Sequence, residues 1–426
     1  MNSWLKRVKY NKEGETNVVK PLDGLVVLDL TRFLAGPYCT MLLGGLGAEV
    51  IKVEQRDSAD VHRNRPPFGG PKGASLNRQT EDDISMTHLH RSRNKKSITL
   101  NLRRPEGKEL FLRLCEKTDI VVENFAAGTM ERMGLPFSLL QERNPRLILC
   151  SISGFGQRGP RREWRAYDPI IQAASGITSM TGYPDRPPVR AGAAVSDTTT
   201  PLVGVIGVLA ALQLRERTGK GEWVDISMQD SSFFLLPEIL EFMAAGDKPQ
   251  RNANAHVSGA PFNAYEAKDG YVAICAMTAS DWGKLIVAIG REELASDARF
   301  ANIISRREHR QDVDAIVQEW IGQRTMSEAV EHLQNQGVPA SPVLSPEELV
   351  YDEHLQSRDM VVDLQHPTRG VVPGVKAIGM PVKFVNNPVH FDQPAPALGQ
   401  HNEEVYARLL GLDDARLAEL QEQGII

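Results

Sequence analysis

The stretch LVVLDLTRFLAGPYCTMLLGGLGAEVIKVE, residues 25–54, decides the fold of this chain. Its two ends are short apolar runs rich in β-branched residues, and the segment between them has the composition of a helix. The same alternation returns over 97–102, 105–118, 119–124 and 146–152. Strands that alternate with helices at this spacing predict a parallel sheet covered by helices, and uninterrupted apolar runs fit strands that are buried on both faces.

The segments beyond this sheet predict a second domain. Residues 55–86, rich in Arg, Pro, Gly, Asp and Asn, predict a long surface excursion of the kind that often contributes to enzyme sites. WVDISM at 223–228 predicts another strand, followed by a helical run through Met243. The polar stretch 246–261 then predicts a domain boundary.

After this boundary the pattern changes to that of a small α+β domain of roughly 100 residues. FNAYEA at 262–267 and YVAICA at 271–276 flank a KDG turn and predict a hairpin. GVPASPV at 337–343 begins an extended return toward two short helices near 402–424. Amphipathic helical runs are expected near 280–290, 308–322 and 326–335. We therefore divide the chain into an N-terminal extension (1–20), the first part of a large domain (21–225), a connecting helix and linker (226–250), the small domain (251–336), and a linker with a C-terminal return to the large domain (337–426).

Composition excludes several classes of protein. The 426 residues are 41% hydrophobic and carry a net charge of −5, from 49 basic and 54 acidic side chains. Such a balance gives no reason to expect nucleic acid or a membrane as a partner. The N-terminus has no apolar core of a signal peptide, so we expect a cytoplasmic protein. The four cysteines are far apart and lack metal-ligand spacing, so we expect reduced thiols and no metal site; they are Cys39, Cys115, Cys150 and Cys275.

One carboxylate stands out as a candidate nucleophile. In VRAGAAVSDTTTP, residues 189–201, Asp197 precedes three threonines and Pro201. Threonine is a good N-cap and proline suits the first helical position, so a helix is expected to begin here and to continue as a buried apolar segment. A carboxylate at that amino end can attack a carbonyl, and free helix amides can stabilise the oxyanion. A simple helix-capping role for Asp197 remains the alternative.

Nine separated segments, taken together and in this order, resemble the family III CoA-transferases, which include formyl-CoA transferase, carnitine CoA-transferase and the α-methylacyl-CoA racemases. The likeness covers nearly the whole chain from Leu22. The segments are LDGLVVLDLTRFLAGPYCTMLLGGLGAEVIKVEQ, RNKKSITLNLRRPEGKEL, VVENFAAGTMERMGL, NPRLILCSISGFGQRGP, YDPIIQAASG, the Asp197 segment, RTGKGEWVDISM, GVPASPV and PAPALGQHNEEV.

For the fold, the resemblance implies a Rossmann-like large domain made from N- and C-terminal segments, an inserted small domain, and an interlocked dimer. For the chemistry, it implies that Asp197 attacks the thioester of an acyl-CoA to form an anhydride. The CoA thiolate then returns to give an aspartyl-CoA thioester, from which an acceptor acid takes the CoA. Ser196 and Pro201 replace the two glycines that usually flank this segment, and Ser196 is expected to alter how closely the thioester approaches.

The resemblance also assigns binding residues. After VIKVE the arginine of formyl-CoA transferase is matched by Gln55, with Arg56 adjacent. Leu34 replaces a glutamine of that enzyme, and Gly259 and Ala260 lie in a loop with fewer glycines than its counterpart. These three are expected to line an acyl pocket for an acid larger than oxalate. The resemblance implies that CoA is contacted by Arg56, Leu100, Arg103, Asn124, Phe125, Arg132, Met133 and Arg165. From the residues alone, a packed core and a solvated arginine face are the alternative.

Two rival functions remain open. A racemase would need a histidine base directly before Asp168, but Tyr167 occupies that position, and tyrosine is a poor base near neutral pH. Tyr167 and Asp168 resemble an auxiliary transferase pair instead, with a capping role for Asp168 as the alternative. The second rival is a silent CoA-binding subunit of a heteromer, against which the presence of Asp197 argues.

The acids exchanged are not defined by the sequence. The run THLHRSRNKK adds His88, His90 and Arg91, which could bind a second carboxylate or simply form a basic surface. We expect an acyl-CoA such as succinyl-CoA as donor, a mono- or dicarboxylic acid as acceptor, and no permanently bound cofactor. The assembly expected is a homodimer or a heteromer with a related subunit.

Overall fold

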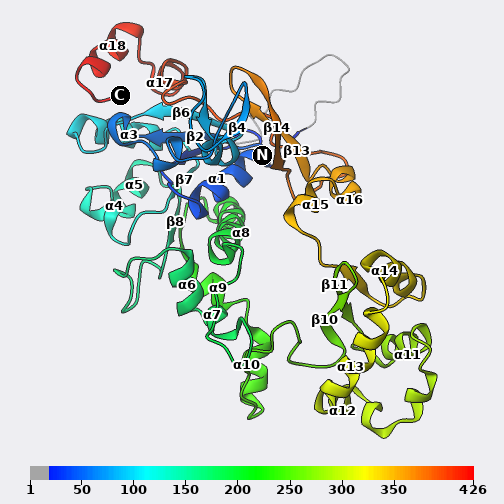
Figure 1. The fold of residues 1–426 in the computed structure, drawn as a ribbon. Coiled ribbons are helices and arrows are strands. Elements are labelled where there is room, and N and C mark those ends of the chain that lie inside the picture. The colour runs from blue at the N-terminus through cyan, green and yellow to red at the C-terminus, as the bar shows by residue number, and fades with distance from the viewer. Residues whose placement is uncertain (1–18) are drawn as a thin grey trace. The chain divides into compact units, whose positions relative to one another are not determined.

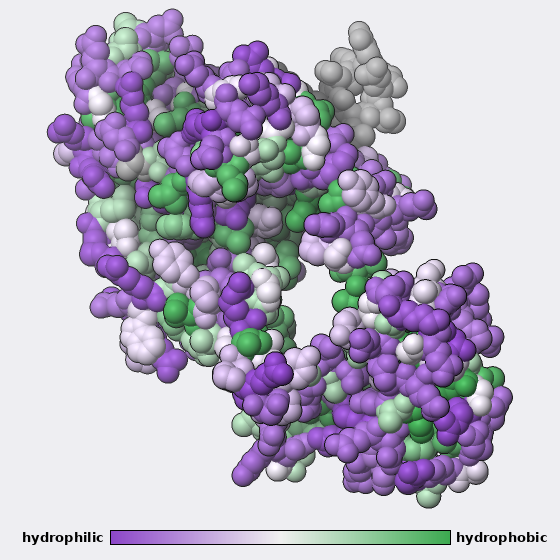
Figure 2. Space-filling view, viewed as in Figure 1, coloured by the Kyte–Doolittle hydropathy of each residue, from purple (hydrophilic) through white to green (hydrophobic). Residues whose placement is uncertain are grey.

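The computed structural model describes residues 19–426, so most of the predicted N-terminal extension lies outside the described residues. The chain divides into two compact units (Figure 1). The first holds residues 19–175, 192–235 and 352–426, and the second holds 176–191 and 236–351. The segment 176–191, which the sequence places in the large domain, therefore belongs to the second unit. On the face seen in Figure 2, both units are mainly hydrophilic.

A six-stranded, fully parallel sheet forms the centre of the first unit. Numbered along the chain within this sheet alone, its six strands lie side by side in the order 3-2-1-4-5-6. This is the strand order of Rossmann folds. The order reverses between the first and the fourth strand, where loops leave in opposite directions. The strands, in spatial order, are β6 (Lys95–Thr99), β2 (Glu49–Glu54), β1 (Val26–Asp29), β7 (Ile120–Glu123), β8 (Ile148–Ser153) and β9 (Trp223–Ser227).

Alternating strand residues bury both faces of this sheet. Leu28 and its neighbours pack with helices on one face, and Val27 with helices on the other. The predicted parallel sheet covered by helices is thus confirmed. The first face carries α3 (Pro105–Cys115), α4 (Thr129–Arg132), α5 (Phe137–Arg143), α17 (Asn402–Leu410) and α18 (Asp414–Glu422); the second carries α1 (Ala35–Gly45) and α8 (Val195–Thr218).

Helix α8 differs from the sequence-based expectation in two ways. It begins at Val195 rather than after Asp197, so Pro201 lies inside the helix and not at its first position. It is also not buried all round, because Leu202, Ile206 and Leu209 are exposed on one side. The helix is long and apolar enough to cross a membrane by length and composition alone, although one third of the qualifying stretch is buried in the protein. Core helices of soluble proteins pass the same test, so this is weak evidence for a membrane span.

The surface excursion and the C-terminal return contain more structure than the sequence indicates. A hairpin of β13 and β14 in the return was missed, because its strands alternate apolar and charged residues only in part. It packs against the small sheet β4-β3-β5 of the excursion. The elements of these two segments are η2 (Arg56–Ser58), η3 (Val61–Arg63), β3 (Phe68–Gly70), β4 (Gly73–Ser75), β5 (Ile84–Ser85), α2 (Met86–Arg91), α16 (Glu353–Ser357), β13 (Val361–His366) and β14 (Gly370–Ile378). The first unit also contains α6 (Asp168–Ala174) and α9 (Met228–Phe233).

The second unit has its own core around a three-stranded sheet. The predicted hairpin is present as β10 (Phe262–Ala267) and β11 (Gly270–Cys275), and the third strand β12 (Ala340–Pro342) pairs with β11. The helices of this unit are α7 (Ile177–Met180), α10 (Pro237–Ala244), α11 (Ala279–Ala288), η4 (Glu292–Ser296), η5 (Ala298–Phe300), α12 (Ile303–Glu308), α13 (Arg310–Ile321), α14 (Met326–Asn335) and α15 (Pro346–Val350).

Candidate active site

A pocket of about 510 Å³ opens at the carboxyl ends of β1, β2, β6 and β7. Ligands of open parallel sheets bind at this edge, where the strand order reverses. Charged, apolar and hydroxyl side chains contribute to its wall. They are Leu30, Thr31, Arg32, Lys52, Val53, Glu54, Gln55, Asp60, Leu100, Leu102, Arg103, Lys108, Phe125, Thr129, Arg132 and Met133.

Most of the residues that the resemblance assigns to CoA lie together at this pocket. Asn124 does not line it but hydrogen-bonds both backbone groups of Arg32, which does. Arg165 is exposed and does not line the pocket, and Arg56 lines an adjoining pocket of about 630 Å³ that shares Asp60 with it. The predicted residues that line the pocket are Leu100, Arg103, Phe125, Arg132 and Met133.

The sequence analysis missed three further cations of this pocket, Arg32, Lys52 and Lys108. Lys52 is buried, donates to the backbone oxygen of Thr31 at 2.7 Å and pairs with Asp60 at 3.5 Å. A lysine between the apolar residues Ile51 and Val53 of a strand was the signal available for it. The other four basic side chains beside apolar walls suit a ligand with both phosphates and a flat ring.

Asp197 lies in the first turn of α8 and is half-buried. Asp168, at the start of α6, accepts the backbone N–H of Ser196 at 2.9 Å and that of Asp197 at 3.3 Å. The Nε2 group of Gln172 donates to the other oxygen of Asp168 at 2.7 Å. A carboxylate from another helix thus caps α8, which explains why the helix begins before the threonines rather than after them.

This cap also overturns the expected oxyanion hole. The first helical amides of α8 already have acceptors: Val195 donates to Ala193, and Thr198 to Ala194. The amides of Ser196 and Asp197 donate to Asp168. The helix dipole still acts on a charge at this end, but free amides are not available there.

Ser196 does not face the reacting side of this turn. Its side chain is fully buried, and its hydroxyl accepts a hydrogen bond of 2.8 Å from Ser232. The side chain of Ser196 packs toward α9, and its effect on the approach of a thioester stays a prediction. The adjacent threonines serve the helix backbone instead, since Thr198 and Thr200 donate to carbonyls of the preceding turn.

Burial and a neighbouring carboxylate raise the pKa of Asp197 to about 6. The loss of hydration on burial has the largest effect, the negative charge of Asp168 adds to it, and the positive charge of Arg91 opposes it. Asp197 is thus ionised at neutral pH, but it takes up a proton at a higher pH than an exposed aspartate does. Perturbed carboxyl groups of this kind are frequent in active sites.

An aromatic and basic cluster lies beside Asp197. Tyr167 is exposed, and its ring meets the edge of Phe33 at 5.9 Å between centroids. Phe33 also meets His62 edge-on at 5.7 Å, and its backbone has a positive φ of 67°. Arg91 donates to the backbone oxygen of Phe33 at 3.0 Å. Since Phe33 follows the pocket residue Arg32, one strained loop joins the pocket to the surroundings of Asp197.

The other predicted acyl-site residues come from both units. Leu34 is half-buried directly before α1, next to Phe33. Gly259 and Ala260 belong to the second unit, where Arg306 donates to the backbone oxygen of Ala260. Their part in an acyl pocket stays a prediction. His88 is buried and contacts the backbone oxygen of Pro396.

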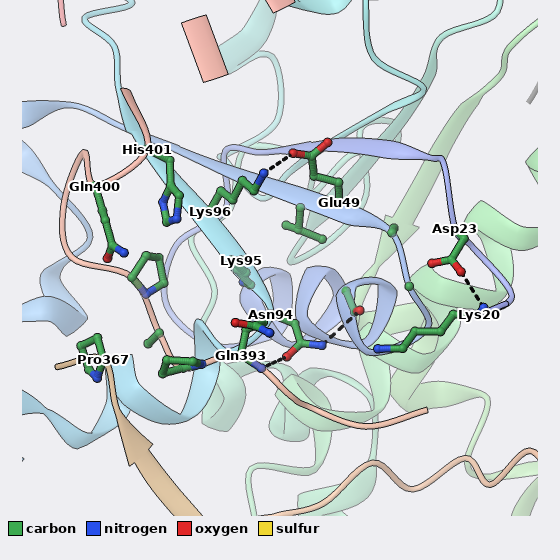
Figure 3. A pocket seen from close by; sticks show the side chains of 17 residues that line it. Lys20, Asp23, Glu49, Asn94, Lys95, Lys96, Pro367, Gln393, Gln400 and His401 are labelled. Carbon is green, nitrogen blue, oxygen red and sulfur yellow. Dashed lines mark hydrogen bonds and ion pairs between the residues drawn. The ribbon is translucent and has the colours of Figure 1, made fainter. Parts of the chain in front are cut away.

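Another pocket, of about 480 Å³, lies at the opposite edge of the sheet (Figure 3). Its three lysines are already neutralised: Lys96 pairs with Glu49 and Glu404, Lys20 with Asp392, and Lys95 with Asp29. Asn94 donates to the backbone of α1 and accepts from Gln393. This pocket at the amino ends of the strands therefore offers a ligand no unpaired lysine charge.

The comparisons with known proteins show the family of this chain. Residues 22–402 match the family model for CoA-transferase family III. The chain belongs to this family. It is 36% identical to a succinyl-CoA–D-citramalate CoA-transferase of Chloroflexus aurantiacus, over 96% of this chain and 98% of the relative. It is 37% identical to a succinyl-CoA:mesaconate CoA-transferase of Haloarcula marismortui, over 90% of this chain and 95% of the relative.

A crystal structure of a CAIB/BAIF family protein from Brucella suis matches with a TM-score of 0.76 and 36% identity, over 92% of this chain and 99% of that one. The resemblance found in the sequence is thus confirmed. The protein is an enzyme of the CoA-transferase class, whose substrates are CoA thioesters.

Proposed function

We propose that this enzyme moves CoA from succinyl-CoA to a carboxylic acid through covalent intermediates on Asp197. The observation that carries the proposal is the half-buried Asp197 in the first turn of α8, fixed there by Asp168 and joined by the Phe33 loop to a basic pocket. The names of the two relatives support succinyl-CoA as donor.

In the proposed reaction, a carboxylate oxygen of Asp197 attacks the thioester carbon, and the C–S bond breaks to release the CoA thiolate. The thiolate then attacks the aspartyl carbonyl of the mixed anhydride, so that succinate leaves and an aspartyl-CoA thioester remains. The acceptor carboxylate repeats both steps in the reverse sense and leaves as its own CoA thioester. No ATP is needed, because the energy of the thioester is kept throughout.

The direct test is incubation with succinyl-CoA and a panel of mono- and dicarboxylic acids, including oxalate, mesaconate and citramalate, with mass detection of new thioesters. New acyl-CoA species are expected.

A parallel reaction in D₂O with a chiral 2-methylacyl-CoA tests the racemase alternative. Deuterium at the α-carbon without any acyl exchange would overturn the transferase proposal.

We also propose that the pocket at the carboxyl edge of the sheet binds CoA. Replacing Arg132 by Ala should raise the KM for succinyl-CoA about tenfold with a smaller change in kcat, because a remote phosphate contact supplies uniform binding. Steady-state kinetics measure both constants. Arg217→Ala, at an exposed position in the last turn of α8, is the matched control. Equal KM values for Arg132→Ala and the control would contradict the assignment.

The proposed nucleophile predicts an acid limb in the pH profile. Because Asp197 must be ionised to attack and has a pKa of about 6, kcat/KM should fall about tenfold per pH unit below that value. Asp168→Asn should move the limb to lower pH, since it removes a negative charge but keeps an oxygen for the α8 amides. Stopped assays from pH 4.5 to 8 measure the limb, and a shift to higher pH in Asp168→Asn would contradict the proposed coupling.

For the assembly, we propose an inserted small domain and an interlocked dimer, as the family resemblance implies. The exposed apolar side of α8 at Leu202, Ile206 and Leu209 supports a subunit contact. Light scattering of the purified chain tests this, and a monomer at micromolar concentration would contradict it. If the enzyme were a heteromer, the purified chain would transfer CoA only after a second subunit had been added.

A further inference from the structure

Arg91, in the last residue of α2, is held in a defined position beside the proposed nucleophile. Its Nη1 group donates to the backbone oxygen of Phe33 at 3.0 Å and approaches Nε2 of His62 at 3.3 Å. Both contacts use the same nitrogen, so the guanidinium keeps further N–H donors for a ligand. The side chain is half-buried, which strengthens its interaction with an anion.

His62 supplies a second observation at this place. Arginine only donates, so Nε2 of His62 must accept from Arg91, and the ring proton then sits on Nδ1. His62 as a whole residue is only 7% exposed, and its Nδ1 has no hydrogen-bond partner among the described residues. A buried donor without an acceptor is costly unless a ligand or water completes it.

Phe33 connects Arg91 to the surroundings of Asp197, because its backbone oxygen accepts from Arg91 and its ring contacts Tyr167. Tyr167 directly precedes Asp168, which accepts the backbone N–H of Asp197. The charges of Arg91 and Asp197 act on each other, yet within residues 19–426 no ion pair joins them directly. A diacid could therefore place one carboxyl carbon at Asp197 and its second carboxylate at Arg91. The other titratable groups that act on Arg91 are Tyr38 and Asp60, which favour its charged form, and Arg65, which opposes it.

The neighbouring cations of the run 87–96 are already engaged. Arg93 donates to the backbone oxygens of His90 and Ile378 and covers the ring of Phe391. Burial and the nearby arginines lower the pKa of His90 to about 4, so it carries no charge at neutral pH. Of the three residues that the sequence singled out, only Arg91 thus combines charge with a position beside Asp197.

We propose that Arg91, positioned by His62, binds the distal carboxylate of a dicarboxylic acyl group and so selects diacids over monoacids. This inference rests on the proposed transferase function. It assigns the preference for diacids to the contact between Arg91 and the carboxylate farthest from the thioester. The donor and the acceptor acid would occupy this position one after the other.

The experiment compares succinyl-CoA with butyryl-CoA, which have four-carbon acyl chains and differ at the end by a carboxylate against a methyl group. The ratio of their kcat/KM values isolates the distal contact, because any effect of Arg91 on Asp197 changes both substrates equally. Arg91→Gln should lower this ratio on the order of 10- to 100-fold, the loss expected for a charge-assisted hydrogen bond. Arg91→Lys should keep part of it, and the control Arg217→Gln should leave it unchanged.

His62→Phe keeps a ring against Phe33 but removes the nitrogen that accepts from Arg91, so it should also lower the ratio of the kcat/KM values. His62→Gln provides an acceptor again and should restore part of the ratio. These two variants test the proposal if Arg91→Gln fails to fold. An equal loss on both substrates in Arg91→Gln would overturn the inference and leave the transferase proposal intact. Absence of transfer from either thioester by the unmodified protein would overturn both.

Discussion

Replacing Asp197 by Asn should abolish CoA transfer, with a loss of about 1000-fold or more in kcat, while the fold is retained. The amide is close in size to the carboxylate but cannot form the anhydride. Its backbone N–H still donates to Asp168, so the cap of α8 is unaffected. Steady-state transfer from succinyl-CoA, with circular dichroism as the check on folding, measures this. Asp414→Asn, in the exposed first turn of α18, is the matched control and should remain active.

A covalent adduct gives an independent readout of the same prediction. After incubation with succinyl-CoA, a peptide that contains Asp197 should carry CoA or an acyl group in mass spectra, and the Asn variant should not. Substantial transfer by Asp197→Asn would remove Asp197 from the mechanism. A complete absence of adduct in the unmodified chain, restored only by a second subunit, would favour a heteromer in which this chain needs a partner.

The large sheet could be predicted because its signal is local. Each strand from 25–28 onward is a short apolar run between helical segments, and burial on both faces of a parallel sheet produces that pattern directly. The strand order did not follow from the runs themselves and came from the family resemblance. The hairpin β13–β14 was missed, since its exposed alternate residues weaken the apolar period.

Several residues that the sequence analysis names lie together at the candidate site, but their contacts did not follow from the sequence. Asp197 and five of the pocket residues follow from matched motifs, whereas the helix start was misplaced because its cap, Asp168, comes from another helix 29 residues away in the chain. Local rules for N-caps and proline describe a helix end without such tertiary partners. The pairing of Arg91 with His62 and Phe33 likewise depends on the fold, since these residues come from three separate segments.

Loss of the buried ion pair under the site should destabilise the protein by about 3 to 5 kcal/mol, the range for an uncompensated buried charge. Asp29 is fully buried at the end of β1, where its carboxylate accepts from Lys95 at 2.9 Å and from the side chains of Thr31 and Thr40. Burial acts to raise the pKa of Asp29, but the charges of Lys95 and Lys52 and the Thr31 bond lower it to about 2.

The substitution Asp29→Ala would leave Lys95 charged or force it to lose its proton inside the core. It would also free the backbone N–H of Thr31, which donates to Asp29 at 2.8 Å. Thr31 begins the loop that carries Arg32 into the pocket and Phe33 to Arg91. Urea unfolding at constant pH measures the free energy of unfolding, and the KM for succinyl-CoA should rise with the loss of loop order.

The double variant Asp29→Ala with Lys95→Met separates the two contributions. Removing both charges should recover most of the free energy of unfolding, because the penalty comes from the unpaired lysine rather than from the lost attraction. The KM should recover less, since the N–H of Thr31 still lacks its acceptor. If the double variant were as unstable as Asp29→Ala alone, the cost would lie in the hydrogen bonds that hold the loop, and the ion pair would contribute little to the stability of the site.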